Sequence, residues 1–235
     1  MKKTILAGSL LACALAACAG AGDPANGGRA GEMRFLALGD SYTIGEGVDP
    51  AERWPVQLAG LLRERGIPVG DPQIIARTGW TTDELSAAID RADPRGPYAL
   101  VTLLIGVNNQ YRGRDAEEYR AQFAALLQRA IGFAGGEASR VVVLSIPDWG
   151  VTPFAAGRDR AKIAAEIDAY NAINREEAQR AGAHWVDVTA QSREAGADAA
   201  FLVADGLHPS GRAYAEWARL ALPAAVQALG PSPAN

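Results

Sequence analysis

Short apolar segments alternate with helix-like segments along most of this 235-residue chain, and this alternation restricts the possible folds more than any other feature. A short, continuous apolar run is typical of a strand that is covered on both faces. Five such runs occupy residues 34–38, 73–76, 98–105, 140–146 and 184–188. Thr81 with Glu84 has the pattern of a helix start, and apolar residues recur at helical spacing over residues 54–65, 116–133, 160–181 and 211–229. The alternation predicts a three-layer α/β/α fold with an open, parallel, five-stranded sheet.

The start of the chain has the composition of a bacterial export signal rather than of a folded domain. Two lysines precede an apolar run over residues 5–17, which is too short to span a bilayer as a mature helix. The sequence Leu-Ala-Ala-Cys ends at Cys18 and resembles the lipobox, where bacterial signals are cut and lipid is attached. The alternatives are a lipobox at Cys13 and ordinary small-residue cleavage with Cys18 unmodified.

We therefore expect three parts: an export signal over residues 1–18, a Gly- and Ala-rich flexible tether over residues 19–32, and one folded domain over residues 33–235. The expected location is the cell envelope, with a lipid on Cys18 as the anchor in a bacterial membrane. Both cysteines lie in the leader, so the folded domain contains none for a disulfide.

The charge composition argues against a nucleic-acid partner. The chain has 23 Lys and Arg against 27 Asp and Glu, a net charge of −4, whereas nucleic-acid binding favours a basic face. No segment after the leader has eighteen consecutive apolar residues, so we expect no membrane-spanning helix in the folded domain. We expect a monomer.

Two segments at opposite ends of the folded domain carry the residue types of nucleophilic catalysis. Ser41 follows the first apolar run within Gly-Asp-Ser, and Asp205 precedes His208 by three residues within Asp-Gly-Leu-His. Nucleophilic serine chemistry needs a hydroxyl, a base that takes its proton and a group that holds the tautomer of the base. We assign these roles to Ser41, His208 and Asp205, with a helix or loop cap as the alternative role of Asp205.

The chain has only two histidines, which narrows the choice of base. His184 opens the last apolar run and is interpreted as an ordinary strand-end residue, whereas His208 lies in a Gly/Pro-bounded loop. Two histidines without a cluster of further ligands argue against a catalytic zinc ion, so we expect no metal and no cofactor. Asp40 is a rival orienter, but adjacent residues on an extended chain point apart, so we interpret it as a loop organiser.

Four short blocks carry a resemblance to a known family: Gly39-Asp40-Ser41, Gly79, Gly106-Val107-Asn108 and the Asp-Gly-Leu-His sequence that ends at His208. In this order and spacing they resemble the SGNH (GDSL-type) hydrolases over about residues 33–228. The resemblance implies a flavodoxin-like sheet, Ser41 as nucleophile and His208 as base. It also implies an oxyanion hole made by the backbone N–H groups of Ser41 and Gly79 and by the side-chain amide of Asn108.

The residue types suit those roles, because glycine permits close backbone approach and an amide NH₂ stays a donor at any pH. A turn glycine and a loop hydrogen-bonder are the alternative interpretations of Gly79 and Asn108. One residue departs from the family pattern: Asn109 stands where the family usually has aspartate. The departure puts in doubt the network that anchors this loop.

These observations predict a serine esterase that hydrolyses lipid, acetyl-sugar or small acyl esters through an acyl-serine intermediate. An acyltransferase that uses the same acyl-enzyme is an alternative, as is a lipid-anchored binding protein without catalytic activity. The substrate, a small-molecule or glycan ester, is not specified by the motifs.

A candidate wall of the substrate pocket follows the fourth apolar run. Residues 147–154 contain two prolines, a glycine, Trp149 and Phe154, which predicts a shaped loop on the same sheet edge as Ser41. Aromatic side chains commonly line apolar recesses for ligands, so we expect at least one of the two aromatics to border the site. The alternative is that both only pin the loop to the core.

Overall fold

The computed structural model describes residues 31–230. Cys13, Cys18, the expected signal and most of the expected tether lie outside the described residues. Five strands form one sheet, in which all neighbouring strands are parallel and the order is β2-β1-β3-β4-β5. The strands are β1 (Phe35–Gly39), β2 (Gln73–Ala76), β3 (Leu100–Leu104), β4 (Val141–Leu144) and β5 (His184–Val186). The predicted open, parallel, five-stranded α/β sheet is confirmed.

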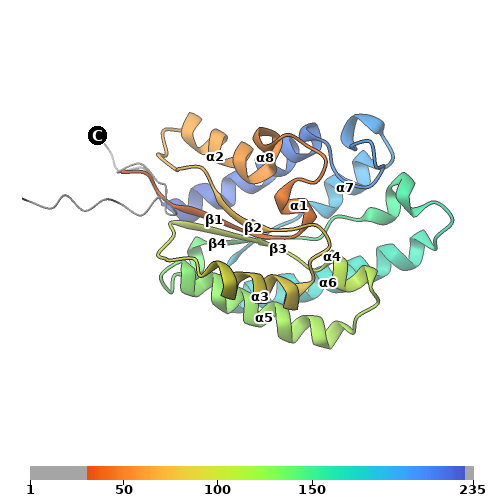
Figure 1. Cartoon of the computed structure of the whole chain (residues 1–235), viewed down its shortest axis with the longest axis horizontal. Coiled ribbons are helices and arrows are strands. Elements are labelled where there is room, and N and C mark those ends of the chain that lie inside the picture. Colours follow the sequence, from red (N-terminus) through yellow and green to blue (C-terminus); the bar gives the residue numbers. More distant parts are fainter. Residues whose placement is uncertain (1–30, 231–235) are drawn as a thin grey trace, which may run out of the picture.

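Helices cover both faces of this sheet (Figure 1). One face carries α1 (Ser41–Ile44), α2 (Trp54–Glu64), α7 (Thr189–Ala195) and α8 (Gly211–Leu229). The other face carries α3 (Thr82–Ala92), α4 (Val107–Tyr111), α5 (Ala116–Phe133) and α6 (Arg160–Ala181). Short 3₁₀ turns complete the connections: η2 (Pro50–Glu52), η3 (Ala138–Arg140), η4 (Trp149–Val151), η5 (Pro153–Ala155) and η6 (Ala199–Phe201). None of the helices within residues 31–230 is long and apolar enough to cross a membrane.

Local signals in the sequence explain where the long helices begin and end. Thr81 is the N-cap of α3, and Glu84 Oε2 accepts a hydrogen bond from the Thr81 N–H at 2.9 Å, which completes a capping box. Asp159 caps α6 by accepting from the N–H of Lys162, and α6 ends at Gly182, whose φ of +78° is left-handed. The predicted spans of α5, α6, α8 and β2 agree with the structure, whereas the other strands are displaced or shortened by one or two residues at their ends.

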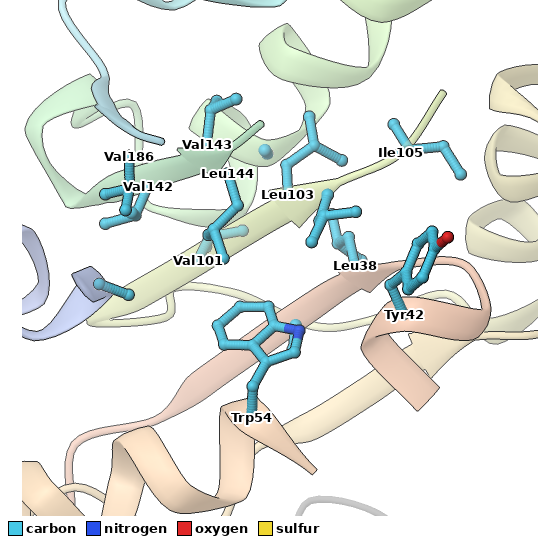
Figure 2. Close-up of a cluster of buried hydrophobic side chains, with 14 of the residues drawn as sticks. Leu38, Tyr42, Trp54, Val101, Leu103, Ile105, Val142, Val143, Leu144 and Val186 are labelled. Atoms are coloured by element: carbon cyan, nitrogen blue, oxygen red, sulfur yellow. The ribbon is translucent and has the colours of Figure 1, made fainter. Parts of the chain in front are cut away.

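The core lies on both sides of the three central strands. Every residue of β1, β3 and β4 is buried, which explains their continuous apolar sequences. Figure 2 shows Trp54, at the start of α2, beside the apolar side chains of these strands, which include Leu38, Val101 and Leu144. Burial of each such side chain stabilises the fold by about 1.5–3 kcal/mol.

The strand order places a crevice at one end of the sheet. The chain leaves β1 for β2 on one side and joins β3 on the other, so the carboxyl ends of β1 and β3 form the point where ligands bind in open α/β sheets. Gly39 pairs with Leu104 in the register of these strands. A Cβ at Gly39 would lie 2.5 Å from the Leu104 carbonyl oxygen, so the close approach of the two strand ends requires glycine.

Candidate active site

Ser41 begins a helix that the sequence did not predict. It is the first residue of the four-residue α1, directly after β1, and it is 4% exposed. Asp40 is the N-cap of α1, and its Oδ1 accepts a hydrogen bond from the Tyr42 N–H at 3.0 Å. The serine was expected in a strand-end loop, but the cap turns the chain sharply and places Ser41 on the first turn of a helix. α1 is too short to show helical periodicity in the sequence.

The imidazole of His208 and the carboxylate of Asp205 form a direct pair. His208 Nδ1 lies 2.6 Å from Asp205 Oδ2, and His208 is 7% exposed. Asp205 Oδ1 accepts from the backbone N–H groups of Leu207 at 2.8 Å and His208 at 2.9 Å. Burial acts to raise the pKa of Asp205, but the hydrogen bonds from His208 and the backbone outweigh it and lower that pKa below its ordinary value. The charged carboxylate favours a proton on Nδ1 and leaves Nε2 as the acceptor.

Asp40 differs from Asp205 in its contacts and its ionisation. It is fully buried, makes no hydrogen bond to His208, and its Oδ2 has no hydrogen-bond partner among the described residues. Burial raises the pKa of Asp40 from 3.8 to about 7, against the lowering effect of the bond from Tyr42. This geometry fits the role of Asp40 as an organiser of the chain after β1, because the hydrogen bond that its side chain accepts from the Tyr42 N–H caps α1.

Backbone and ring contacts hold the loop that carries the acid–base pair. The Gly206 carbonyl accepts from the Phe154 N–H at 3.1 Å, and the His208 carbonyl accepts from the Val203 N–H at 2.9 Å. The Tyr42 ring packs 5.6 Å from the imidazole of His208. His184, in contrast, is the first residue of β5 and therefore lies at the amino end of the sheet, away from Ser41.

Two of the three predicted oxyanion donors, Gly79 and Asn108, lie on the segment 79–82 and on α4, and both line the same pocket as Ser41. Gly79 has a φ of +87°, and its carbonyl accepts from Arg112 Nη2 at 2.6 Å. Asn108, in α4, donates one Nδ2 hydrogen to the Trp80 carbonyl at 2.9 Å. An amide NH₂ carries two hydrogens, so Asn108 retains one for a ligand. α4 and its C-cap Arg112 therefore hold this segment through two consecutive carbonyl groups.

Asn109, which stands where the family usually has aspartate, provides a third tie between α4 and this segment. The network that anchors the loop is therefore present with asparagine at this position. Asn109 is fully buried; its Oδ1 accepts from the Thr82 N–H at 3.1 Å and its Nδ2 donates to Thr82 Oγ1 at 2.7 Å. The hydroxyl of Thr82 in turn donates to Gln122 Oε1, whose amide is oriented because its Nε2 donates to the Glu118 carboxylate. Thr82 Oγ1 must therefore accept a hydrogen bond from the side chain at position 109. The NH₂ of asparagine can donate that bond, whereas an ionised aspartate has no hydrogen to donate.

A pocket of about 170 Å³ opens between these elements. It brings together Ser41, His208, Gly79 and Asn108, whereas Asp205 lies behind His208 and does not line it. The lining also contains residues that sequence reasoning missed; all except Tyr111 lie within a motif or next to a motif residue. The full lining is Ser41, Tyr42, Thr78, Gly79, Val107, Asn108, Tyr111, Trp149, Phe154, Leu207 and His208.

Three aromatic rings form one wall of the pocket. Trp149 and Phe154 both line it, in the two 3₁₀ turns η4 and η5 rather than in an irregular loop. Tyr111 joins them, with its ring 5.3 Å from Trp149 and 6.2 Å from Phe154. Trp149 is buried and donates from Nε1 to Gln110 Oε1 at 2.8 Å, so it also fixes the segment to the core. Phe154 and Tyr111 are 40% and 44% exposed.

The arrangement supplies a hydroxyl, an imidazole with a held tautomer and an amide NH₂ around one pocket. Within residues 31–230, no three His, Cys, Asp or Glu side chains gather as potential metal ligands. The chemistry available from the side chains of this pocket is therefore nucleophilic attack with proton transfer and stabilisation of an oxyanion.

Comparison with known proteins gives the same outline. The sequence profile of the GDSL-like Lipase/Acylhydrolase family matches residues 37–216. No curated protein matches the chain by sequence. The crystal structure of TesA superposes with a TM-score of 0.64 at 21% identity, covering 82% of this chain and 97% of that one. An acetylxylan esterase from Geobacillus stearothermophilus gives 0.60 at 21% identity, covering 82% and 94%. A lipase from a goat rumen metagenome gives 0.64 at 18%, covering 82% and 97%.

Proposed function

Because this chain belongs to the GDSL-like Lipase/Acylhydrolase family and is a hydrolase of ester bonds, we propose that Ser41, His208 and Asp205 are its catalytic residues. The reaction is hydrolysis of a carboxylic ester through an acyl-serine intermediate. The observation that carries the proposal is the 2.6 Å contact between His208 Nδ1 and Asp205 Oδ2, beside a pocket lined by both Ser41 and His208. That contact leaves the other ring nitrogen of His208 as the acceptor that a serine nucleophile needs.

In the first half of the reaction, Ser41 Oγ attacks the carbonyl carbon of the ester while its proton moves to His208 Nε2. Asp205 stabilises the imidazolium that forms. The carbonyl oxygen becomes an oxyanion, which accepts hydrogen bonds from the N–H groups of Ser41 and Gly79 and from Asn108 Nδ2. The tetrahedral intermediate then collapses: the bond to the alcohol oxygen breaks, and that oxygen takes the proton from His208.

In the second half, water replaces the alcohol. His208 Nε2 removes a proton from the water as it attacks the acyl carbon, and the same donors hold the second oxyanion. Collapse releases the carboxylic acid and returns the proton to Ser41 Oγ. The ties from Arg112 to the Gly79 carbonyl and from Asn108 to the Trp80 carbonyl support this role, because donors that are already oriented need no reorganisation in the transition state.

Two experiments test the assignment of the nucleophile: its removal by substitution and its covalent labelling in the wild-type protein. Ser41→Ala should lower hydrolysis of an aryl acetate by at least about 10³-fold, because the triad acts as a unit. A fluorophosphonate should modify Ser41 and no other serine, as read by peptide mass spectrometry. Ser210→Ala is the matched control, since Ser210 caps α8 close to His208 without lining the pocket. Retained activity in Ser41→Ala, or a label on a different serine, would overturn the mechanism.

The substrate and the location belong to the same proposal. The fold is shared with an acetylxylan esterase and a lipase, so rates across acyl lengths and on acetylated xylan would assign the ester class.

We further propose export and a lipid anchor on Cys18, supported by the Leu-Ala-Ala-Cys sequence. In a bacterial host the protein should fractionate with membranes, and Cys18→Ser should release it or block its processing. Wild-type protein in the soluble fraction with a free Cys18 thiol would contradict the anchor.

A further inference from the structure

One cation lies at the centre of the aromatic wall. The guanidinium carbon of Arg158 is 5.2 Å from the ring centre of Tyr111, 5.3 Å from that of Trp149 and 5.7 Å from that of Phe154. Its Nη2 also donates to the Tyr111 hydroxyl at 3.1 Å. These ring contacts hold the guanidinium at the rim of the pocket, so a ligand that binds there loses little side-chain entropy in ordering it.

The charge of Arg158 is not balanced by a carboxylate. None of the ion pairs within residues 31–230 includes Arg158, and its side chain is exposed. Arg112, the other arginine beside the pocket, is instead bound to Glu84 Oε1 at 3.2 Å and to the Gly79 carbonyl. Among residues 31–230, one of the five guanidinium N–H donors of Arg158 is therefore engaged in a hydrogen bond, and the side chain is exposed.

A carboxylate without an arginine or lysine partner lies on the other side of the pocket among residues 31–230. Glu46 accepts a hydrogen bond from Thr78 Oγ1, and Thr78 follows β2. Arg158 follows η5, on the β4 side of the sheet, and the nucleophile after β1 lies between the two in the strand order. Asp205 is engaged by His208. A negatively charged substrate group would therefore be repelled near Thr78 and attracted near Phe154.

The size of the pocket indicates that part of the substrate extends to this rim. Its volume of about 170 Å³ is smaller than the roughly 300–1,000 Å³ of pockets that enclose a drug-sized ligand. Of the three large hydrophobic side chains that are exposed within residues 31–230, Tyr111 and Phe154 lie here. An apolar surface around a single unpaired cation suits a ligand that combines apolar and anionic groups.

We propose that the rim formed by Tyr111, Phe154 and Arg158 is a subsite for a carboxylate or phosphate carried by the ester substrate several bonds from the scissile bond. Arg158 pairs with that anion through its solvent-facing N–H groups, and the two exposed rings contact the apolar part next to it. This inference deepens the proposed esterase function and rests on it. The substrates are therefore anionic esters that place a small group inside the pocket and the anion at the rim.

The experiment compares anionic and neutral esters of the same framework. The pair 4-acetoxybenzoate and methyl 4-acetoxybenzoate puts the charge on the alcohol side; the 4-nitrophenyl esters of adipic acid and of monomethyl adipate put it on the acyl side. The measured quantity is the ratio of kcat/KM, anionic over neutral, in each pair and each variant. Ratios across variants cancel differences in intrinsic reactivity. Hydrolysis of the neutral esters tests the proposed function separately, because it does not need Arg158.

Arg158→Glu should lower this ratio by about threefold to tenfold in at least one pair, since exposed ion pairs are weak but charge-assisted hydrogen bonds add to them. Arg158→Lys should keep most of the preference and controls for the loss of ring packing. Arg140→Glu makes the same charge change in η3, at the amino end of β4, and should leave the ratio unchanged. An unchanged ratio in Arg158→Glu, or an equal drop in Arg140→Glu, would overturn the inference.

Discussion

The inner and outer parts of the pocket are held in different ways, although α4 contributes to both. In the inner part, three ties run from α4 and its C-cap to the segment 79–82: Asn108 to the Trp80 carbonyl, Asn109 to Thr82 and Arg112 to the Gly79 carbonyl. In the outer part, Tyr111 meets Phe154 through ring contacts at 6.2 Å, and both rings are exposed. Directional bonds hold the groups proposed for chemistry, whereas the two exposed rings of the rim meet each other only through a non-directional contact.

The difference follows from what each part has to do. A donor that is displaced by about 1 Å from a developing oxyanion can cost roughly 10²-fold in rate, so catalytic groups need directional restraint. Ring contacts tolerate changes in geometry and contribute only about 0.5–1.5 kcal/mol per pair beyond burial. Substitutions in the inner part should therefore change the rate of the chemical step, whereas substitutions at the rim should change which ester is preferred.

Among substitutions that leave the nucleophile and the base in place, the largest effect is expected from Asp205→Asn, because the amide would hold the wrong tautomer of His208. Its oxygen would keep the two bonds from the backbone N–H groups of residues 207 and 208, so its NH₂ would face Nδ1 of His208. The ring proton would then move to Nε2, which could no longer accept a proton from Ser41. We expect kcat to fall by roughly 10²- to 10⁴-fold. A loss smaller than that of Asp40→Asn would show that Asp40 is the orienter.

Asp40→Asn should keep most of the activity and change the pH dependence of stability. The carboxyl of Asp40 titrates at 3.8 in the unfolded chain and at about 7 in the folded protein, so only the folded protein holds this proton between these values. The free energy of unfolding of the wild type should therefore fall, by up to about 1.4 kcal/mol per pH unit, as the pH rises through this window. The asparagine variant should lack this contribution, as denaturant unfolding at a series of pH values would show.

A smaller effect is expected from Arg112→Ala, which removes one tie of the inner part without touching substrate. The Gly79 carbonyl would lose its 2.6 Å partner, so the segment that carries the Gly79 N–H would be held less firmly in its orientation toward the oxyanion. We expect kcat to fall about tenfold with little change in KM, because the lost interaction matters in the transition state.

Arg114→Ala is the matched control for Arg112→Ala. Arg114 lies two residues further along and pairs with Asp83 and Glu118, but it does not contact the segment that carries Gly79. An equal loss of kcat in both variants would assign the effect of Arg112 to general stability instead of to the orientation of Gly79.

The smallest effect is expected from Phe154→Ala at the rim. The side chain is 40% exposed, so its loss should lower the melting temperature by only a few degrees. Relative rates across esters of increasing acyl length should change by about twofold to fivefold, since part of the apolar wall is removed. Trp149→Ala should instead reduce stability strongly, because Trp149 is buried and bonded to Gln110. Unchanged relative rates in Phe154→Ala would show that the rim does not contribute to substrate selection.

Much of the fold could be predicted because its signals are local. The spans of α5 and α6 follow from helical spacing and from caps such as Asp159, and each buried strand is a short apolar run. The short helices α1, α4 and α7 were missed, because four to seven residues do not establish a period. Residues 147–154 were expected to form an irregular loop, but they form η4 and η5.

The candidate site was predictable only where its residues belong to a motif. Ser41, Gly79, Asn108 and His208 line one pocket, and Asp205 bonds to His208, as the motif order implied. Tyr111 and Arg158 carry no motif and lie in two successive strand connections, one before β4 and one after it, so no local pattern connects them. Likewise, the effect of asparagine at position 109 depends on Thr82 and Gln122, which meet it only in the folded protein.

The sequence by itself determined the fold class, the helix caps and the residue types available for catalysis, since hydrophobic periodicity and short motifs are encoded within a few neighbouring residues. Only the tertiary structure decided the strand order, the three ties that hold Gly79 and Asn108, and the aromatic rim around Arg158. Those features depend on which segments the packing of the sheet brings together. Contacts between residues distant in sequence arise from burial and from hydrogen-bond satisfaction across the whole domain, and no single segment specifies them.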